Sequence, residues 1–326
     1  MQTSIPSPGS QQEVQTPPAR GLAPVTVVIL TFNEEQNLPA CLASVASWAG
    51  QIVIVDSGST DRTREIARDF GATLLSHPFE THSKQWRWAL DNLPAAPTGE
   101  TSEWILGLDA DQRISHELAE EIRDLLCPCA SAAREGNQPA EIDGYYIKRR
   151  QVFQGRWIRH GGYYPKYLLK LFRRDRVLFD EHDLVDHHFH VRGKVGKLRN
   201  DLIEDNRKED DINFWIQKHC RYAVALAREE LRRNSRESES PIVPRLWGTP
   251  DQRVLWLKHA WYRLPLFVRP FLYFFYRYFL RLGFLDGKQG FVFHFLQGFW
   301  YRLLVDIHLD QLRREPAARN GESERH

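Results

Sequence analysis

The chain has 326 residues, of which 42% are hydrophobic and 26% are charged, enough for one α/β domain with a helical appendage. The formal net charge is only +2 at pH 7 and the sequence contains no known nucleic-acid-binding module, so a nucleic-acid partner is not expected. The four cysteines form no disulfide or metal-binding pattern and the N-terminus lacks the apolar core of a signal peptide, which together predict a cytoplasmic protein.

The first predicted elements are a strand and a helix that follow a polar tail. Residues 1–22 are rich in Ser, Gln and Pro and are expected to be disordered. Residues 25–30 form a short apolar, β-branched run, which predicts a buried strand. Residues 37–48 have apolar side chains at helical spacing, with Asn37 as the expected N-cap and Gly50 as the expected end of the helix.

The same alternation continues along the chain. Residues 51–55 predict a second strand, residues 62–70 a helix closed by Gly71, residues 72–75 a third strand and residues 102–108 a fourth. This order predicts a parallel sheet with helices on both faces. Ligands bind beyond the carboxyl ends of the strands in such sheets, so the polar residues that follow the strands are expected to meet at one edge.

The fourth predicted strand leads into Asp109-Ala-Asp111. Side chains two residues apart in an extended segment project to the same face, so the two carboxylates can act together. Mg²⁺ and Mn²⁺ prefer oxygen ligands, and Mg²⁺ is commonly shared between carboxylates and substrate phosphates. The pair therefore predicts a divalent-cation site for a diphosphate substrate. Taken alone, it also fits a surface loop with two acids.

Asp56 directly follows the second predicted strand. An acidic residue at such a position accepts hydrogen bonds from a ribose in dinucleotide-binding folds. A turn-stabilising acid in Asp-Ser-Gly-Ser is an equally good interpretation. The first strand is followed by Thr-Phe-Asn-Glu-Glu rather than by G-x-G-x-x-G, and no Walker loop occurs in the sequence, which disfavours a Rossmann oxidoreductase and a P-loop protein.

Three blocks of the sequence, in this order, resemble the signature of family 2 inverting glycosyltransferases with the GT-A fold. They are residues 25–44, residues 52–61 with Asp-Ser-Gly-Ser-Thr-Asp, and residues 106–113 with Asp-Ala-Asp-x-Arg. A late Gly-Phe-Leu-Asp-Gly at residues 283–287 makes the chain most similar to the bacterial lipopolysaccharide-core β-1,4-glucosyltransferase type. The resemblance covers residues 24–312.

The resemblance implies a UDP-sugar donor and a divalent cation, Mg²⁺ or Mn²⁺, and it gives roles to individual positions. Asp111 would be the principal metal ligand and Asp109 would contact ribose or metal. Glu204 stands where relatives carry a metal-binding histidine, with a solvated acidic turn as the alternative. The residues expected near the nucleotide, the last two on a looser match, are Leu30, Thr31, Phe32, Glu34, Asp56, Gln85 and Arg87.

Inversion at an anomeric carbon requires one general base for the acceptor hydroxyl and stabilisation of the departing diphosphate. Related transferases carry Val-His-Glu in the region of the base, whereas this chain has Val-Asp-His ending at His187. We predict that Asp186 is the base, with Glu181 and His187 as further candidates. A zinc site among the neighbouring histidines is disfavoured, because the segment has neither a cysteine partner nor an H-E-x-x-H spacing.

Residues 155–166, upstream of the predicted base, combine Arg, Lys and His with Trp and Tyr. Aromatic faces stack on sugars and Arg binds phosphate, so we predict that this loop contacts a phosphorylated or carbohydrate acceptor. The alternative is a loop whose aromatic side chains only cap the sheet.

The last third of the chain changes character. Between Gln252 and Leu285 there is no acidic residue, and Arg and Lys punctuate a run rich in Trp, Tyr, Phe and Leu. These charges, together with Pro265 and Pro270, disfavour a membrane-spanning helix. They predict basic amphipathic helices in a membrane interface, with simple packing against the rest of the protein as the alternative.

The predicted architecture is α/β, with a GT-A domain and a mostly parallel central sheet at residues 23–210, an amphipathic helical, membrane-associating region at 211–315 and a disordered tail at 316–326. The predicted function is metal-dependent transfer of a hexose, glucose in the first place, from a UDP-sugar to a lipid-linked or lipopolysaccharide-core saccharide. The enzyme would work at the cytoplasmic face of the cell membrane. The alternatives are a polyprenyl-phosphate glycosyltransferase and a non-catalytic, membrane-associated sugar-nucleotide binding protein.

Overall fold

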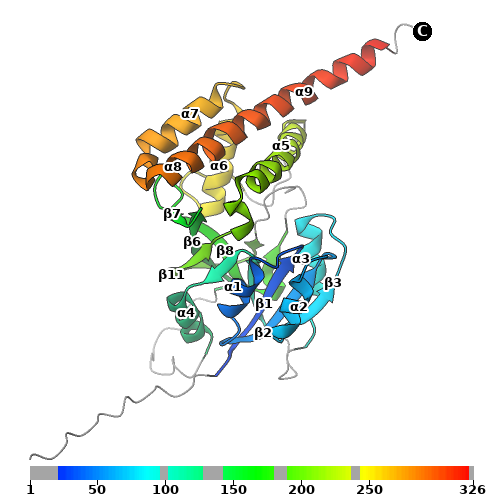
Figure 1. Ribbon diagram of the computed structural model, residues 1–326, viewed down its shortest axis with the longest axis vertical. Helices are drawn as coiled ribbons and strands as arrows, with labels where there is room; N and C mark the ends of the chain where they lie inside the picture. Colours follow the sequence, from blue (N-terminus) through cyan, green and yellow to red (C-terminus); the bar gives the residue numbers. More distant parts are fainter. Residues whose placement is uncertain (1–20, 96–101, 128–141, 180–188, 236–242, 323–326) are drawn as a thin grey trace, which may run out of the picture.

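The computed structural model describes residues 21–95, 102–127, 142–179, 189–235 and 243–322. Figure 1 shows a sheet flanked by helices at one end of the molecule and a group of helices at the other. The sheet is built from the earlier part of the chain and the helical end from the last third, so the change in sequence character coincides with a change in architecture.

The main sheet is mixed. Its strands are β1 (Ala23–Thr31), β2 (Ala49–Asp56), β3 (Thr73–Ser76), β4 (Trp104–Asp109), β5 (Gln112–Ile114), β6 (Gly144–Phe153), β7 (Arg156–Ile158), β8 (Lys166–Arg173) and β11 (Val195–Glu204). The order is β3-β2-β1-β4-β8-β6-β11-β5, with β7 paired to β6. β1 is parallel to β2 and β4, and β2 is parallel to β3, which confirms the predicted parallel unit. β8 is antiparallel to both β4 and β6. A separate small sheet pairs β9 (Val177–Leu178) with β10 (His190–Val191).

Helices cover both faces of the sheet, as predicted. Those on one face are α1 (Leu38–Ala43), α2 (Thr63–Asp69) and α4 (His116–Leu126), whereas α3 (His82–Asp91) covers the other. In β1, Val25, Val27 and Ile29 pack with the first group and Val28 packs with α3. Since successive side chains of a strand point to opposite faces, a strand covered on both sides needs an unbroken apolar run.

The first helix is shorter than predicted. It ends at Ala43 rather than at residue 48, and Gly50 lies inside β2 instead of ending the helix. A Cβ on Gly50 would lie 2.6 Å from the carbonyl oxygen of Ala23, so the glycine is needed for the close approach of β2 to β1. Asn37 occupies the N-cap position, but its side chain makes no capping hydrogen bond.

The helical end comprises α5 (Ile212–Ser235), α6 (Pro250–Tyr262), α7 (Arg269–Phe275), α8 (Gly287–Phe293) and α9 (Tyr301–Glu322). A π-helix at Tyr276–Leu280 and a 3₁₀-helix at Gly283–Asp286 connect α7 to α8, and a second π-helix at His294–Trp300 leads into α9. Among the described residues, no helix is both long enough and apolar enough to cross a bilayer. Pro265 lies between α6 and α7, and Pro270 lies in the first turn of α7, as expected for residues that separate helices.

The helices pack on one another and on the sheet through apolar clusters. α5 contacts α9 through Ala223, Ala227, Val305 and Leu309. A second cluster joins the sheet to the helices through Phe153, Ile158, Trp215 and Phe293. This second cluster fixes the position of α5 relative to the carboxyl end of β6 and to β7.

A buried ion-pair network also ties three of these helices together. Arg269 of α7 is fully buried and donates to Glu230 of α5 at 2.8 and 3.0 Å. Its Nε donates to Asp306 of α9 at 2.7 Å. Removing one member of such a network leaves an unpaired buried charge, so the network specifies how the three helices dock.

Candidate active site

Three strands end together at one edge of the sheet. Thr31 at the end of β1 is paired in register with Asp56 at the end of β2, and Leu30 is paired with Asp109 at the end of β4. The hydroxyl of Thr31 donates to a carboxylate oxygen of Asp56 at 3.1 Å. The polar segments that the sequence placed after separate strands therefore meet, as expected from parallel strands.

Asp56 has the geometry of a turn-stabilising acid. Its side chain is fully buried and accepts hydrogen bonds from the backbone N–H groups of Gly58 at 3.2 Å and Ser59 at 3.0 Å. Arg64 lies 3.6 Å from the same carboxylate. The carboxylate thus shapes the loop after β2, while the nearby Phe32 ring is 57% exposed and open to a ligand.

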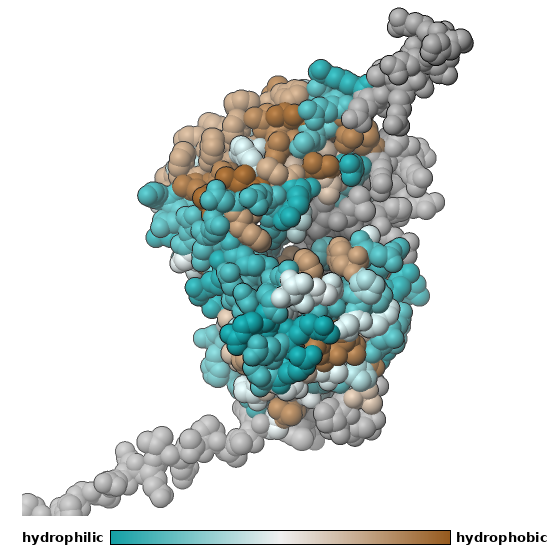
Figure 2. Space-filling model, turned by 45° about the vertical axis from the view of Figure 1, so that its right-hand side comes forward, coloured by the Kyte–Doolittle hydropathy of each residue, from teal (hydrophilic) through white to brown (hydrophobic). Residues whose placement is uncertain are grey.

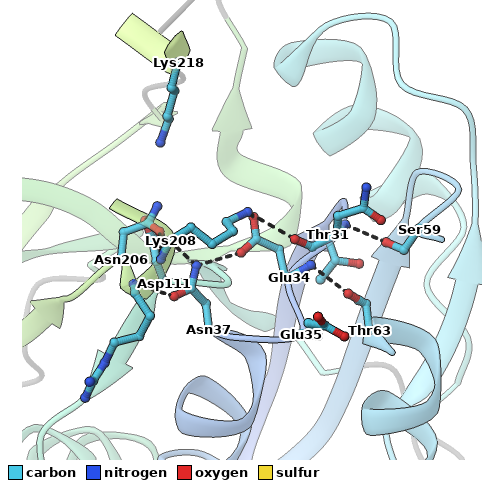
Figure 3. Close-up of polar contacts among 12 residues, drawn as sticks. Thr31, Glu34, Glu35, Asn37, Ser59, Thr63, Asp111, Asn206, Lys208 and Lys218 are labelled. Atoms are coloured by element: carbon cyan, nitrogen blue, oxygen red, sulfur yellow. Dashed lines mark hydrogen bonds and ion pairs between the residues drawn. The ribbon is translucent and has the colours of Figure 1, made fainter. Parts of the chain in front are cut away.

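Glu34 is the centre of a network that joins the loop after β1 to the segment before α5 (Figure 3). Its carboxylate accepts from the amide of Asn37 at 2.8 Å and from the ammonium group of Lys208. Lys208 also donates to the carbonyl oxygen of Asn33 at 3.2 Å. The backbone N–H of Glu34 donates to the hydroxyl of Thr63 at 2.7 Å, which holds the loop against α2.

Two asparagines extend this network to the acidic pair. The amide of Asn37 donates to the side-chain oxygen of Asn206 at 3.1 Å, and Asn206 donates to the carboxylate of Asp111 at 3.0 Å. The backbone N–H of Asp205 donates to the carbonyl oxygen of Asp111 at 2.9 Å. The position of Asp111 is therefore fixed by Asp205 and Asn206, which are far from it in the sequence.

Asp111 lies in a strongly negative environment. Burial, and then the charges of Glu204 and Asp109, hold the pKa of Asp111 well above its usual range. The pKa of the Cys41 thiol is also raised, first by burial and then by Asp111 and Asp109. Excess negative charge of this kind is relieved when a cation binds, so the donor set fits a divalent metal ion at Asp111 and Asp109.

The other acids of the predicted metal set have protein partners. Asp109 pairs with Lys170 at 3.0 Å, and Lys170 is itself buried in β8. Glu204 accepts from Arg149 at 2.9 Å and from the amide of Gln112 at 2.9 Å. Within the described ranges, no group of three or more His, Cys, Asp or Glu side chains has the arrangement of a metal site.

Lys218 brings a positive charge to this edge from α5. It pairs with Glu209 at 2.7 Å, and Figure 3 shows its side chain pointing toward Asn206 and Asp111. Burial lowers the pKa of Lys218, but the charges of Glu209, Tyr222 and Asp111 more than offset this, and the net pKa is raised. Lys218 therefore stays protonated at physiological pH.

A cavity of about 390 Å³ opens beside Asp111. It is lined by Gln36, Asn37, Pro39, Ala40, Asp111, Arg113, Asp205, Arg207 and Asp210. Arg113 and Arg207 both contact Asp205, at 2.7 and 3.4 Å, so the two guanidinium groups share one carboxylate in the cavity wall.

Two residues of α3, Gln85 and Arg87, were expected near the nucleotide on a looser match to the family, and their side chains point in different directions. Gln85 is buried and donates to the hydroxyl of Ser57 and the carbonyl oxygen of His77, both at 3.1 Å, so it supports the loop after β2. Arg87 is exposed and lines a second cavity with Arg174, Val177 and Phe179 among others. The two cavities share no lining residue.

The three candidate bases, Glu181, Asp186 and His187, lie outside the described residues. The chain is described again from Phe189, whose ring packs against Trp86 and Phe172. A Cβ on Gly107 of β4 would come within 2.7 Å of this ring, so Phe189 lies directly on the strand that ends at Asp109.

Asn37, Lys170, Asn206, Lys208 and Lys218 were not assigned to the site from the sequence. Lys170 had a usable signal, because it is a charged residue within the apolar strand sequence KYLLKLFR. A buried lysine in a strand needs a carboxylate partner. The asparagines and the other two lysines follow no local pattern that indicates their contacts.

The chain is similar in sequence to several curated proteins. It is 29% identical over 186 residues to the lipopolysaccharide core biosynthesis glycosyltransferase LpsC of Rhizobium meliloti, which covers 54% of this chain and 60% of LpsC. It is 32% identical over 139 residues to a TPR repeat-containing protein of Synechococcus elongatus, which covers 41% of this chain and 32% of that protein. The chain thus spans less than two thirds of the length of either relative.

Two solved structures are also similar. The S. aureus protein TarS (1-349), in complex with UDP, is 16% identical, with 89% of this chain and 91% of that chain covered and a TM-score of 0.41. Glucosyl-3-phosphoglycerate synthase from Mycobacterium tuberculosis, in complex with Mn²⁺ and UDP-glucose, is 20% identical, with 40% and 44% covered and a TM-score of 0.28.

A sequence profile described as Glycosyl transferase family 2 matches residues 26–192, which is more than half of the chain. This match includes β1, β2, β4 and the acidic pair, the elements that build the edge described above. Because the profile covers these elements in more than half of the chain, the chain belongs to glycosyl transferase family 2, and its mixed α/β sheet has the GT-A fold.

Proposed function

We propose that this glycosyltransferase moves a hexose, glucose in the first place, from a UDP-sugar to a lipid-linked or lipopolysaccharide-core saccharide, with inversion at the anomeric carbon. The observation that carries the donor side is Asp111, a carboxylate with a raised pKa beside Asp109 at the edge where β1, β2 and β4 end. LpsC, a similar protein, is described as acting in lipopolysaccharide core biosynthesis, which supports the acceptor class.

In this proposal the nucleotide lies over the ends of β1 and β2. Leu30 and Thr31 form the floor, and the exposed Phe32 ring offers a face for the base. Glu34 is held in place by Lys208, while Asp56 shapes the loop after β2 and would contact the nucleotide from there. The residues proposed to support this pocket from α3 are Gln85 and Arg87.

The divalent cation, Mg²⁺ or Mn²⁺, would be held by Asp111 and Asp109 together with the diphosphate. When bound, it supplies a Lewis acid for the leaving group. Glu204 would coordinate the cation only if its ion pair with Arg149 broke, since both of its carboxylate oxygens accept from that guanidinium in the described structure. The protein's own contribution is the fixed position of Asp111, which Asn206 provides.

The experiment that tests the function combines nucleotide-sugar binding with product analysis. A nucleotide at 100 times its dissociation constant stabilises a protein by about 2.7 kcal/mol, so a panel of nucleotide sugars with Mn²⁺ can be ranked by thermal unfolding. The best donor is then incubated with a core saccharide and with a polyprenyl phosphate, and the products are identified by mass spectrometry. Transfer only to the polyprenyl phosphate would select that alternative, and binding without any transfer would select the non-catalytic one.

Lys218 provides a test of leaving-group stabilisation by the protein. Lys218→Met is expected to lower the transfer rate about a hundredfold, because it removes a partly buried cation that points toward the proposed diphosphate site. Lys218→Arg keeps the charge and is expected to retain more activity. The measurement is the initial rate at saturating donor, with Lys84→Met, an exposed lysine of α3, as the matched control. An unchanged rate in Lys218→Met would exclude this role.

A further inference from the structure

The exposed apolar side chains of this protein are concentrated on its helical end. Figure 2 shows brown, apolar residues gathered over that end, while the visible face of the sheet end is mainly teal. Many of these side chains lie in one segment, on α7, on the two short helices that follow it and between those helices. We call them the α7–α8 surface, which consists of Phe271, Phe275, Phe279, Leu280, Leu282 and Leu285, between 47% and 64% exposed. An apolar patch of this kind marks an interaction site.

The exposed charges of residues 253–306, the segment that carries this surface, have one sign. Arg253, Arg263, Arg281 and Lys288 are exposed. The sequence between Gln252 and Asp306 contains one acid, Asp286, and both Asp286 and Asp306 are buried. The region therefore presents cations and aromatic rings to its surroundings, with no exposed carboxylate between residues 253 and 306 to compensate them.

The two buried acids are already occupied inside the protein. Asp306 binds Arg269, and Asp286 accepts from the ring of His160 at 2.7 Å and from its backbone N–H at 2.9 Å. Both acids therefore stabilise the fold from inside and are not available to the exposed cations of this segment. Aromatic rings with uncompensated cations are the composition of helices that lie in a membrane interface, where lipid phosphates supply the negative charge.

We propose that the α7–α8 surface docks on a bilayer that contains anionic lipid, and that this docking places the loop at residues 155–166 at the level of the lipid headgroups. The bilayer itself is the occupant of the surface. The identity of the acceptor rests on the proposed function, whereas the docking does not.

The loop is held by hydrogen bonds to the same segment that carries the docking surface. The backbone N–H of Gly161 donates to the carbonyl oxygen of Arg281 at 2.8 Å, and Arg277 donates to the carbonyl oxygen of Gly161 at 2.6 Å. Gly161 has φ +66°, and a Cβ there would lie 2.0 Å from the ring of His294. The loop therefore fits against the helices without room for a side chain at this point.

The other end of the loop is fastened to the sheet. Tyr164 donates from its hydroxyl to Asp201 of β11 at 3.0 Å. The same strand ends at Glu204, which accepts a hydrogen bond at 2.9 Å from the amide of Gln112, the residue next to Asp111. One short loop thus bridges the docking surface and the strand that leads to the candidate active site, which is the arrangement needed for an acceptor held in a membrane.

Vesicle binding tests the docking. The full chain is sedimented with vesicles of phosphatidylcholine alone or of phosphatidylcholine with phosphatidylglycerol. We expect binding to the anionic vesicles, weakened by salt, and a loss of about tenfold or more in Leu280→Ser/Leu285→Ser, because both side chains enter the interface. The matched control Phe79→Ser changes a ring that is 51% exposed before α3 and is expected to bind as the wild type does.

The charges are tested by a second variant. Arg263→Gln/Lys288→Gln is expected to weaken binding to anionic vesicles by about fivefold for each cation removed, and to leave any binding to neutral vesicles unchanged. No binding to anionic vesicles, or equal binding by the wild type and the leucine variant, would overturn the proposal. A wild-type dimer that becomes monomeric in the leucine variant would assign the surface to a second copy and overturn it too.

The position of the loop is tested without any transfer assay. Trypsin can cleave after Arg156 and Arg159, both of which are exposed. Anionic vesicles are expected to slow this cleavage in the wild type and not in Leu280→Ser/Leu285→Ser. Unchanged cleavage in vesicle-bound wild type would show that the loop is not at the lipid surface. Stabilisation by UDP, measured on every variant, reports separately on the donor site and on folding.

Discussion

Asp111→Asn is expected to abolish metal-dependent UDP binding and to lower hexose transfer by at least about a hundredfold, because a neutral amide replaces the principal proposed metal ligand. The fold should survive the change. Asn206 donates to one oxygen of Asp111 at 3.0 Å, and the side-chain oxygen of an asparagine can accept the same bond. The measurements are UDP titrations with and without Mn²⁺ and initial rates of transfer.

The same variant gives a pH-dependent prediction for the metal-free protein. The pKa of Asp111 is raised in the folded state, so the folded protein holds this proton at pH values where the unfolded chain has released it. Stability due to this group is therefore lost as pH rises from the usual Asp range to the raised pKa. Asn has no proton to lose, so metal-free Asp111→Asn should unfold at the same temperature as the wild type or at a higher one near neutral pH.

A matched control separates the metal site from general acidity of the cavity. Asp210 lines the same cavity but is exposed, and Asp210→Asn should leave Mn²⁺-dependent UDP binding unchanged. Equal UDP binding in Asp111→Asn and the wild type would discard the metal assignment. A large drop in the unfolding temperature of metal-free Asp111→Asn would instead show that Asp111 is structural.

The strands at the active edge could be predicted because their signals are local, whereas their order in the sheet was not predicted. β-branched apolar runs define β1 and β2, and parallel pairing then brings Thr31, Asp56 and Asp109 to one edge whatever the loops do. Gly50 was misinterpreted, because a glycine signals both a helix end and a close backbone approach. Only the packing of β2 against Ala23 decides between them.

The network that fixes Asp111 could not be predicted from local patterns. Asn37 and Asn206 are separated by 169 positions in the sequence and meet only when the sheet is complete. Lys218 depends on the docking of α5, which the apolar cluster around Trp215 fixes. Sequence therefore located the acids, whose spacing is informative, and missed the neutral and basic groups that hold them.

Asp186→Asn is expected to lower transfer by about 10²–10⁴-fold while UDP binding stays unchanged, because a general base contributes that much and the donor site is built from other residues. Asp186 precedes Phe189 by three residues, and Phe189 packs on Gly107, two residues before Asp109 in β4. Asp186 itself lies outside the described residues, and the ground for testing it first is the Val-Asp-His sequence. The measurement pairs initial rates with UDP titrations, so that a slower transfer step is distinguished from weaker binding of the donor nucleotide.

Glu181→Gln and His187→Gln complete the comparison, since both residues flank Asp186 in the same segment. If Asp186 is the base, only its substitution should abolish the acidic limb of the pH–rate profile. A carboxylate base titrates below the range of histidine, so an acidic limb near pH 6.5 that disappears in His187→Gln would move the role to His187. Full activity in all three variants would place the general base outside this segment. The Val-Asp-His sequence would then have no role in activating the acceptor hydroxyl.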